Sequence, residues 1–121
     1  MRLYALRGAT SVERNDERAI AEATSELMRE IMKRNSLQPA DVISCIFTAT
    51  EDLDADFPAA AARAVGFEAV PLLCAREIDV PTAMPRVIRV LIHYHAAEGH
   101  RPQHVYLGEA SALRSDLQAA Q

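Results

Sequence analysis

Short apolar segments alternate with helix-forming segments along this chain, and this alternation limits the possible folds more than any other feature. Brief runs of aliphatic and aromatic residues that stop at glycine, proline or polar turns predict strands. These predicted strands span residues 2–9, 42–49, 69–74 and 103–107. Capping residues and apolar residues at helical spacing predict helices between the strands. The predicted helices span residues 15–34, 59–65 and 81–98.

The order β-α-β-α-β-α-β indicates an α/β or an α+β domain whose sheet buries one face on helices, and of the two we predict an α+β domain with a small mixed β-sheet. A chain of 121 residues is long enough for one core, so residues 1–121 are expected to form a single domain, with residues 112–121 as a C-terminal extension. In so short a chain, the second face of the sheet is most simply covered by another copy of the subunit. We therefore expect a closed homo-oligomer.

The prediction of the two long helices rests on capping residues at their ends and on apolar residues along one face. Asn15 is a candidate N-cap for the first helix, and Asn35 is a plausible stop after it. Pro81 opens the last helix, and Gly99 closes it. The apolar stripe of the last helix consists of Val87, Ile88, Leu91, Ile92 and His95. Both helices are expected to cover one face of the sheet.

Charge and hydropathy exclude several classes of function. Thirteen Lys plus Arg against seventeen Asp plus Glu give a formal net charge of −4, which is the wrong sign for a protein that binds nucleic acid through a broad basic face. Apolar runs stay below the roughly 18 residues of a transmembrane helix, and the N-terminus lacks the apolar core of a signal peptide. We expect a cytoplasmic protein with no nucleic-acid or membrane partner.

Cysteine and histidine usage argues against metal chemistry. Cys45 and Cys74 lie singly in apolar stretches, which predicts reduced thiols rather than a disulfide or a zinc knuckle. Of the four histidines, His93 and His95 are two apart on a predicted helix and would point in different directions. The sequence also lacks the signatures of phosphate loops, dinucleotide-binding loops, nucleophile elbows and zinc proteases. We therefore expect no metal, no cofactor and no nucleophile.

Charged residues near predicted strands and loops are candidates for a binding site. Arg7 ends the first strand, Arg89 lies in an apolar stretch, and Arg114 lies in the extension. A charge among apolar residues needs a partner or a site. The alternative for Arg89 is the exposed stripe of an amphipathic helix, and spacing alone does not decide between the two. Glu77 follows the third strand, where loops often carry function, but a salt bridge to Arg76 or another surface arginine is its simpler explanation.

Six segments stand out by their order and spacing. They are residues 7–14 (RGATSVER), 49–59 (ATEDL through FPA), 70–71 (VP), 74–80 (CAREIDV), 88–90 (IRV) and 104–107 (HVYL). Together they resemble the monofunctional, trimeric class of bacterial chorismate mutase, over nearly the whole chain. The resemblance implies an isomerase that converts chorismate to prephenate by a Claisen rearrangement. It also implies a homotrimer that forms a pseudo-α/β-barrel, with active sites between subunits.

The resemblance implies roles for the residues at matching positions. Arg7 and Tyr106 would hold a substrate carboxylate. Arg89 would contact the ether oxygen and a carboxylate, and Glu77 would face the ring and its hydroxyl. The remaining site residues would be Cys74 beside Glu77, Phe57 and Arg63 near the mouth of the cleft, and Leu113 and Arg114 folded over it. Ala60 stands where a lysine is expected, which would weaken the positive rim of the cleft.

The implied chemistry agrees with the lack of an evident nucleophile. Chorismate is a dianion, and its rearrangement needs a compact reactive conformer and stabilisation of the charge that separates as the C–O bond breaks. A trimeric small-molecule-binding or enamine-deaminating protein of similar architecture is the alternative, since an arginine that holds a carboxylate serves both. The set of Arg7, Glu77, Arg89 and Tyr106 favours the mutase.

Overall fold

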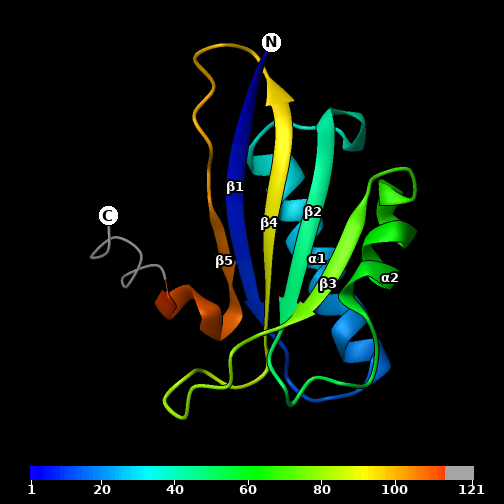
Figure 1. The fold of residues 1–121 in the computed structure, drawn as a ribbon, viewed down its shortest axis with the longest axis vertical. Helices are drawn as coiled ribbons and strands as arrows, with labels where there is room; N and C mark the ends of the chain where they lie inside the picture. The colour runs from blue at the N-terminus through cyan, green and yellow to red at the C-terminus, as the bar shows by residue number, and fades with distance from the viewer. Residues whose placement is uncertain (114–121) are drawn as a thin grey trace.

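The chain forms a mixed five-stranded sheet with a long helix across one face (Figure 1). The computed structural model describes residues 1–113. The strands are β1 (Arg2–Ser11), β2 (Val42–Ala49), β3 (Leu72–Arg76), β4 (Val87–Ala96) and β5 (Val105–Leu107). The α-helices are α1 (Glu17–Arg34) and α2 (Pro58–Ala62). Short 3-10 helices span Pro39–Asp41 and Gly108–Ala112, and a π-helical turn spans Arg63–Phe67.

The strand order β3-β2-β4-β1-β5 places β4 at the centre of the sheet. β4 runs antiparallel to β1 and β2, whereas β3 is parallel to β2 and β5 is parallel to β1. The predicted α+β class and mixed sheet are therefore confirmed. β3 is an edge strand, in agreement with the Pro71 that precedes it, because proline cannot donate to a hydrogen-bond ladder.

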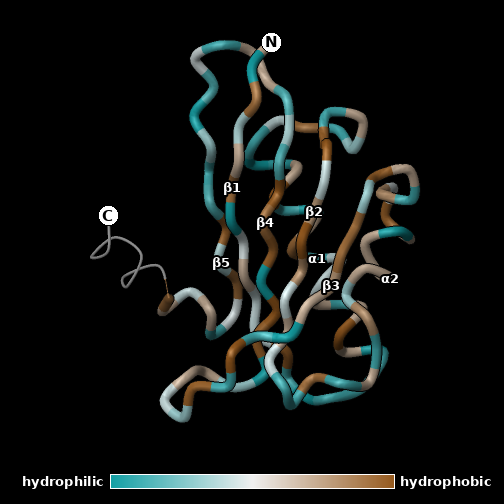
Figure 2. Tube along the Cα trace, viewed as in Figure 1, coloured by the Kyte–Doolittle hydropathy of each residue, from teal (hydrophilic) through white to brown (hydrophobic). Residues whose placement is uncertain are grey.

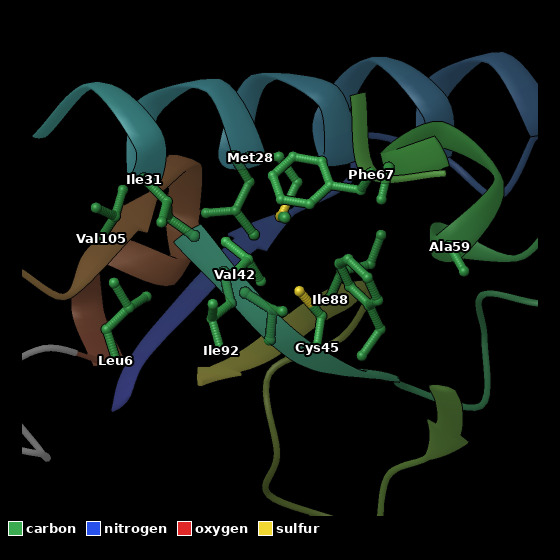
Figure 3. Packing of buried hydrophobic residues seen from close by; sticks show 14 of the residues in the cluster. Leu6, Met28, Ile31, Val42, Cys45, Ala59, Phe67, Ile88, Ile92 and Val105 are labelled. Atoms are coloured by element: carbon green, nitrogen blue, oxygen red, sulfur yellow. The ribbon is translucent and has the colours of Figure 1, made fainter. Parts of the chain in front are cut away.

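The core lies between α1 and one face of the sheet, where apolar residues of the strands gather (Figures 2 and 3). Leu27 and Ile31 of α1 belong to one buried cluster with Phe47 of β2 and Ile92 of β4. Gly8 lets the helix lie close to β1, because a Cβ at that position would lie 2.7 Å from the Cδ1 of Ile31. The tight approach of α1 fixes which face of each strand is buried.

The predicted helix over residues 81–98 is wrong, because residues 87–96 form strand β4. Burial alternates along β4 with a period of two. The residues that join the core under α1 are Ile88, Val90, Ile92 and Tyr94. The wrong prediction arose because the start of β4 has apolar residues on both faces, so its pattern fits the period of a helix as well as that of a strand. The β-branched residues of this segment favour the strand. The observed order is β-α-β-α-β-β-β, with one long helix on the sheet instead of two.

The other predicted elements lie close to their expected positions. β2 has the predicted bounds, β1 runs two residues further, β3 is displaced toward its C-terminal end, and β5 is shorter. The predicted helix over residues 59–65 is α2 with the π-helical turn after it, and Gly66 in that turn has a φ of +109° that suits glycine. Of the predicted extension, only residues 112 and 113 belong to the described part of the chain. Within residues 1–113, helices long and apolar enough to cross a membrane are absent.

The N-cap of helix α1 lies one residue later than predicted. Asp16, not Asn15, is the N-cap: its Oδ1 accepts a hydrogen bond from the N–H of Ala19 at 2.7 Å. This hydrogen bond lowers the pKa of Asp16, because it stabilises the carboxylate. Asn15 instead donates to the carboxylate of Asp54 and accepts from the N–H groups of Asp54 and Ala55. The exposed Asn15 thus holds the loop before α2.

Asn35 ends α1, as predicted, and it also ties the helix to the segment before β5. Its side chain is buried, with the residue 4% exposed. Its Nδ2 donates to the carbonyls of Ile31 at 2.9 Å and Gln103 at 3.0 Å, and its Oδ1 accepts from the N–H of Gln103 at 2.7 Å. One buried amide therefore satisfies three backbone groups from two distant segments.

Replacement of the two asparagines should separate the effect of burial from the number of hydrogen bonds. Asn35→Ala removes three hydrogen bonds of a buried side chain and takes these partners from the part-buried backbone groups of Gln103, so it should lower the free energy of unfolding by about 2 to 3 kcal/mol. Asn15→Ala removes as many hydrogen bonds, but water replaces them, so its loss should stay below about 1 kcal/mol. Urea denaturation of both variants measures the difference, and equal losses would contradict the assignment of Asn35 as a buried clamp.

Candidate active site

A pocket of about 510 Å³ lies on the sheet face opposite α1. Strands β1, β2 and β4 form its floor, and β5 and the segment after it form one side. The lining residues are Arg7, Gly8, Ala9, Ile46, Thr48, Arg89, Val90, Leu91, Tyr106 and Leu113. Four of the sequence-predicted site residues therefore share one pocket: Arg7, Arg89, Tyr106 and Leu113.

Strand register brings the charged residues of the pocket together. Thr48 lies directly opposite Arg89 in the β2–β4 pair, and Ala9 lies opposite Arg89 in the β1–β4 pair. Arg7 lies one row further along the same face, because side chains two apart on a strand point to the same side. The neighbours of Arg89 in sequence, Ile88 and Val90, are buried under α1. Core packing thus directs Arg89 to the pocket.

Arg89 forms an ion pair with Glu77, the residue that follows β3. Nη1 of Arg89 lies 3.3 Å from Oε1 of Glu77, and the two side chains are 41% and 12% exposed. Thr48 donates its hydroxyl hydrogen to the other carboxylate oxygen of Glu77 at 2.7 Å. The backbone N–H of Glu77 also donates to the carbonyl of Ala49 at 3.0 Å, which extends the pairing of β2 and β3. Glu77 is therefore held at both its backbone and its carboxylate.

This geometry decides between the alternatives that the sequence left open. Arg89 is not on the exposed stripe of a helix: it lies in the central strand and has a carboxylate partner. Glu77 does pair with an arginine, but that arginine is Arg89 in the pocket, and Arg76 instead donates to the carbonyl of Glu51 at 3.1 Å. A largely buried carboxylate needs such partners. Arg89 and Thr48 line the pocket, and Glu77 contacts both of them from the adjoining hollow beside the loop after β3, so the pair lies at the boundary of the pocket and is not a solvated surface contact.

The chemistry of the pocket suits a small anion with an apolar body. Arg7 and Arg89 supply two guanidinium groups, and Leu91 and Ile46 supply apolar surface between them. Guanidinium groups bind carboxylates through paired N–H donors, and they remain charged at all physiological pH values. Tyr106, which pairs with Ala9 in the parallel β1–β5 ladder, lies on the side of the pocket nearest Arg7. Its phenol can both donate and accept a hydrogen bond.

Three predicted site residues lie elsewhere in the subunit. Cys74 pairs with Phe47 and packs against the core, so its side chain points away from the face that carries Glu77. Phe57, which is 68% exposed, shares a second pocket of about 400 Å³ with Cys74. Arg63 is exposed and opens the π-helical turn after α2. Arg114 lies outside the described residues.

The separation follows from the strand order. Phe57 and Arg63 flank α2, which lies beside the edge strand β3, whereas Tyr106 is in β5 at the opposite edge (Figure 1). Contacts within one subunit therefore do not bring Phe57 or Arg63 to the pocket that Arg7 and Tyr106 line. Sequence motifs grouped all these residues in one site, but motif order carries no information about which edge of the sheet they occupy.

The prediction that His93 and His95 point in different directions from a helix is wrong. Both residues lie on β4, two positions apart, and face the same side of the sheet. His93 contacts the hydroxyl of Ser44 at 3.3 Å, and His100 contacts the hydroxyl of Tyr94 at 2.7 Å. Among residues 1–113, groups of three or more His, Cys, Asp or Glu side chains that could hold a metal are absent. Cys45 is a free thiol in the core, where burial raises its pKa to about 12.

Sequence reasoning missed Thr48, although it holds the carboxylate of Glu77. A signal was present, because Thr48 is a polar residue near the end of an otherwise apolar strand, VISCIFTA. A threonine is common in strands, however, and its partner Glu77 lies 29 residues away in sequence. Only the pairing of β2 with β3 brings these two residues together.

Comparison with known proteins finds a consistent set of relatives. The family model for chorismate mutase type I matches residues 3–117. Chorismate mutase AroH of Thermus thermophilus is 48% identical over 118 residues, which cover 96% of this chain and 97% of the relative. Chorismate mutase AroH of Bacillus subtilis (strain 168) is 38% identical over 119 residues, with coverage of 97% and 94%. The solved structure of a chorismate mutase from Clostridium thermocellum superposes with a TM-score of 0.87 at 43% identity, and covers 91% of this chain and 99% of that one.

Proposed function

We propose that the pocket over β1, β2 and β4 is where the substrate rearranges, because this chain belongs to the chorismate mutase type I family. The chain is an isomerase of aromatic amino-acid biosynthesis that converts chorismate to prephenate. The family match does not favour the alternative of an enamine-deaminase-like protein. The observation that carries the proposal is the 3.3 Å pair of Arg89 and Glu77, which places one fixed positive group in the pocket and one fixed negative group beside it.

The rearrangement breaks one C–O bond and forms one C–C bond within the same molecule, without proton transfer. As the C–O bond breaks, negative charge grows on the ether oxygen and positive charge grows on the ring. Arg89 donates to the ether oxygen, and the carboxylate of Glu77 faces the ring. Because both groups are held in place before the reaction, they stabilise the separated charge without reorganisation, which is worth roughly 3 to 4 kcal/mol for one well-aimed donor.

Binding of the dianion in its compact conformer is the second task of the site. Arg7 and Tyr106 hold one carboxylate at the β5 side of the pocket, and Arg89 also contacts a carboxylate through its planar fork. Holding both ends of the substrate over one apolar floor favours the conformer in which the reacting carbons approach each other. Ala60, where a lysine was expected, leaves one fewer positive charge to attract the substrate.

We further propose a homotrimer in which Phe57 and Arg63 of one subunit complete the pocket of its neighbour. Leu3 and Leu73, 55% and 61% exposed, lie on the sheet face that also carries the pocket, and exposed apolar surface of this kind favours a partner subunit. Cys74, which shares the second pocket with Phe57, would lie in the same cleft, and Leu113 lies at its border. Two free thiols agree with a reducing compartment, so we propose that the enzyme works in the cytoplasm.

Removal of the Arg89 guanidinium tests the proposed chemistry. Arg89→Ala should lower kcat by at least about a hundredfold, because the donor to the ether oxygen is lost. The loss of chorismate's diene absorbance on conversion to prephenate measures the rate. Arg18→Ala, which removes an exposed arginine on α1, serves as the control and should keep the wild-type rate. An Arg89→Ala variant with most of its kcat would overturn the mechanism.

Replacement of Thr48 tests whether the position of Glu77 matters. Thr48→Val preserves the shape of the side chain but removes the hydroxyl that donates to Glu77, and should lower kcat by about tenfold. Thr48→Ser keeps the hydroxyl and should stay within about threefold of the wild type. Thermal denaturation of both variants checks that the fold is intact. Similar rates for the valine and serine variants would show that this hydrogen bond is not needed.

The shared cleft is tested by mixing two inactive variants. Arg89→Ala and Phe57→Asp proteins are unfolded, combined in equal amounts and refolded. Random assembly of cyclic trimers gives about one interface in four an intact Arg89 from one subunit and an intact Phe57 from the next. Activity should return to about a quarter of the wild-type value. If mixed trimers form, as light scattering and mass spectrometry can verify, and no activity returns, the two residues do not meet across subunits.

A further inference from the structure

His104, immediately before β5, makes a hydrogen bond that reaches the binding pocket through the backbone. Its Nδ1 accepts from the backbone N–H of Arg7 at 3.0 Å. The parallel pairing of β1 with β5 begins one residue later, at Gly8 and Val105. The imidazole of His104 thus takes the place of a backbone acceptor where the β1–β5 ladder starts. It holds the backbone of β1 at Arg7, whose guanidinium lines the pocket.

This bond requires one protonation state of the ring. A backbone N–H can donate to Nδ1 only if that nitrogen carries no hydrogen, so His104 must be neutral with its hydrogen on Nε2. His104 is exposed, but loss of solvent around its ring lowers its pKa, and the charge of Arg7 lowers the pKa further. The neutral ring is therefore the form that prevails near pH 7.

The charged groups around His104 also favour the neutral ring. His104 also lines a shallow pocket together with Arg34 at the end of α1 and with His100 and Arg101 from the loop before β5. Arg34 is paired with Glu30 at 3.1 Å, so one of these cations is partly neutralised. A proton on His104 would add a positive charge beside Arg7 on one side and beside this group on the other.

We propose that neutral His104 is a positioning residue for chorismate binding, which acts by holding the backbone of Arg7 in register beside β5. This inference rests on the proposed role of Arg7 in holding a substrate carboxylate. Above the pKa of His104 the hydrogen bond is present. Below it, Nδ1 becomes a donor that faces another donor, and Arg7 loses its anchor. Affinity for the dianionic substrate should therefore fall as the pH drops below the pKa of His104, whereas the charge stabilisation by Arg89 and Glu77 in the bound state changes less.

Two variants of His104 separate the acceptor from the titration. His104→Leu has no acceptor and should raise KM for chorismate by about fivefold to tenfold at pH 7.5, with kcat within about threefold of the wild type. His104→Asn can present its Oδ1 near the position of Nδ1, so its KM should stay within about threefold of the wild type. Because the pKa of His104 is lowered, KM of the wild type should rise as the pH falls below about 6.5, and this rise should be absent from the asparagine variant.

His95→Asn is the matched control, because His95 is an exposed histidine on β4 that lies outside the pocket. It should keep both the wild-type KM and its rise at acid pH. A wild-type KM in His104→Leu, or an unchanged acid rise in His104→Asn, would overturn the proposal. An Arg7→Ala background adds a further test, because the effect of His104→Leu on KM should disappear there. A persistent effect would show that His104 acts independently of Arg7.

Nitrogen-15 NMR of the wild-type protein tests the contact even if the variants fold poorly. The spectrum should show His104 with hydrogen on Nε2 and a pKa below the usual value of about 6.5. Hydrogen on Nδ1 at neutral pH would overturn the inference. Failure of the proposed function would look different: the wild-type protein would not convert chorismate, while the NMR result for His104 would be unaffected.

Discussion

The antiparallel pairing of β4 between β1 and β2 determines both the core and the candidate site. Because side chains alternate along a strand, one set of β4 residues packs under α1, while the other set, which includes Arg89, faces the pocket. The same register sets Thr48 beside Arg89 and Leu91 beside Arg7. A slip of one residue would bury Arg89 and expose Ile88. The free energy of burying the core therefore also holds the charges in position.

The carboxylate of Glu77 and the guanidinium of Arg89 hold each other in position at the site. Glu77 is largely buried, with Arg89 as its ion-pair partner and Thr48 as a further hydrogen-bond donor to its carboxylate. A reaction without proton transfer or covalent intermediate depends on fixed charges of this kind, since they are the groups that can distinguish the transition state from the substrate. The partly exposed Arg89 keeps donors free for a ligand, while the more buried Glu77 is anchored. The pair thus combines a rigidly held carboxylate on Glu77 with a guanidinium on Arg89 that a ligand can reach.

The β5 side of the pocket is held in a different way from the centre. β5 has only three residues, so its ladder to β1 is short. Two side chains strengthen its attachment: Asn35 binds the backbone of Gln103, and His104 binds the backbone of Arg7. The edge that carries Tyr106 therefore depends on polar contacts to the backbone as well as on apolar burial. The His104 contact responds to protonation of the imidazole, whereas the amide contacts of Asn35 and the apolar core beneath β4 do not.

The sequence by itself determined the elements whose signals are local, and it named the pocket residues through motifs. β2 and the end of α1 at Asn35 lie where predicted, because a short apolar run and a polar stop leave few alternatives. Tertiary structure alone decided that residues 87–96 form a strand, because their apolar pattern fits two periods and pairing with β1 and β2 favours one of them. It also decided that Glu77 pairs with Arg89 rather than Arg76, and that Phe57 lies at the far edge from Tyr106. These outcomes depend on contacts between residues distant in sequence, and a local pattern carries no information about such contacts.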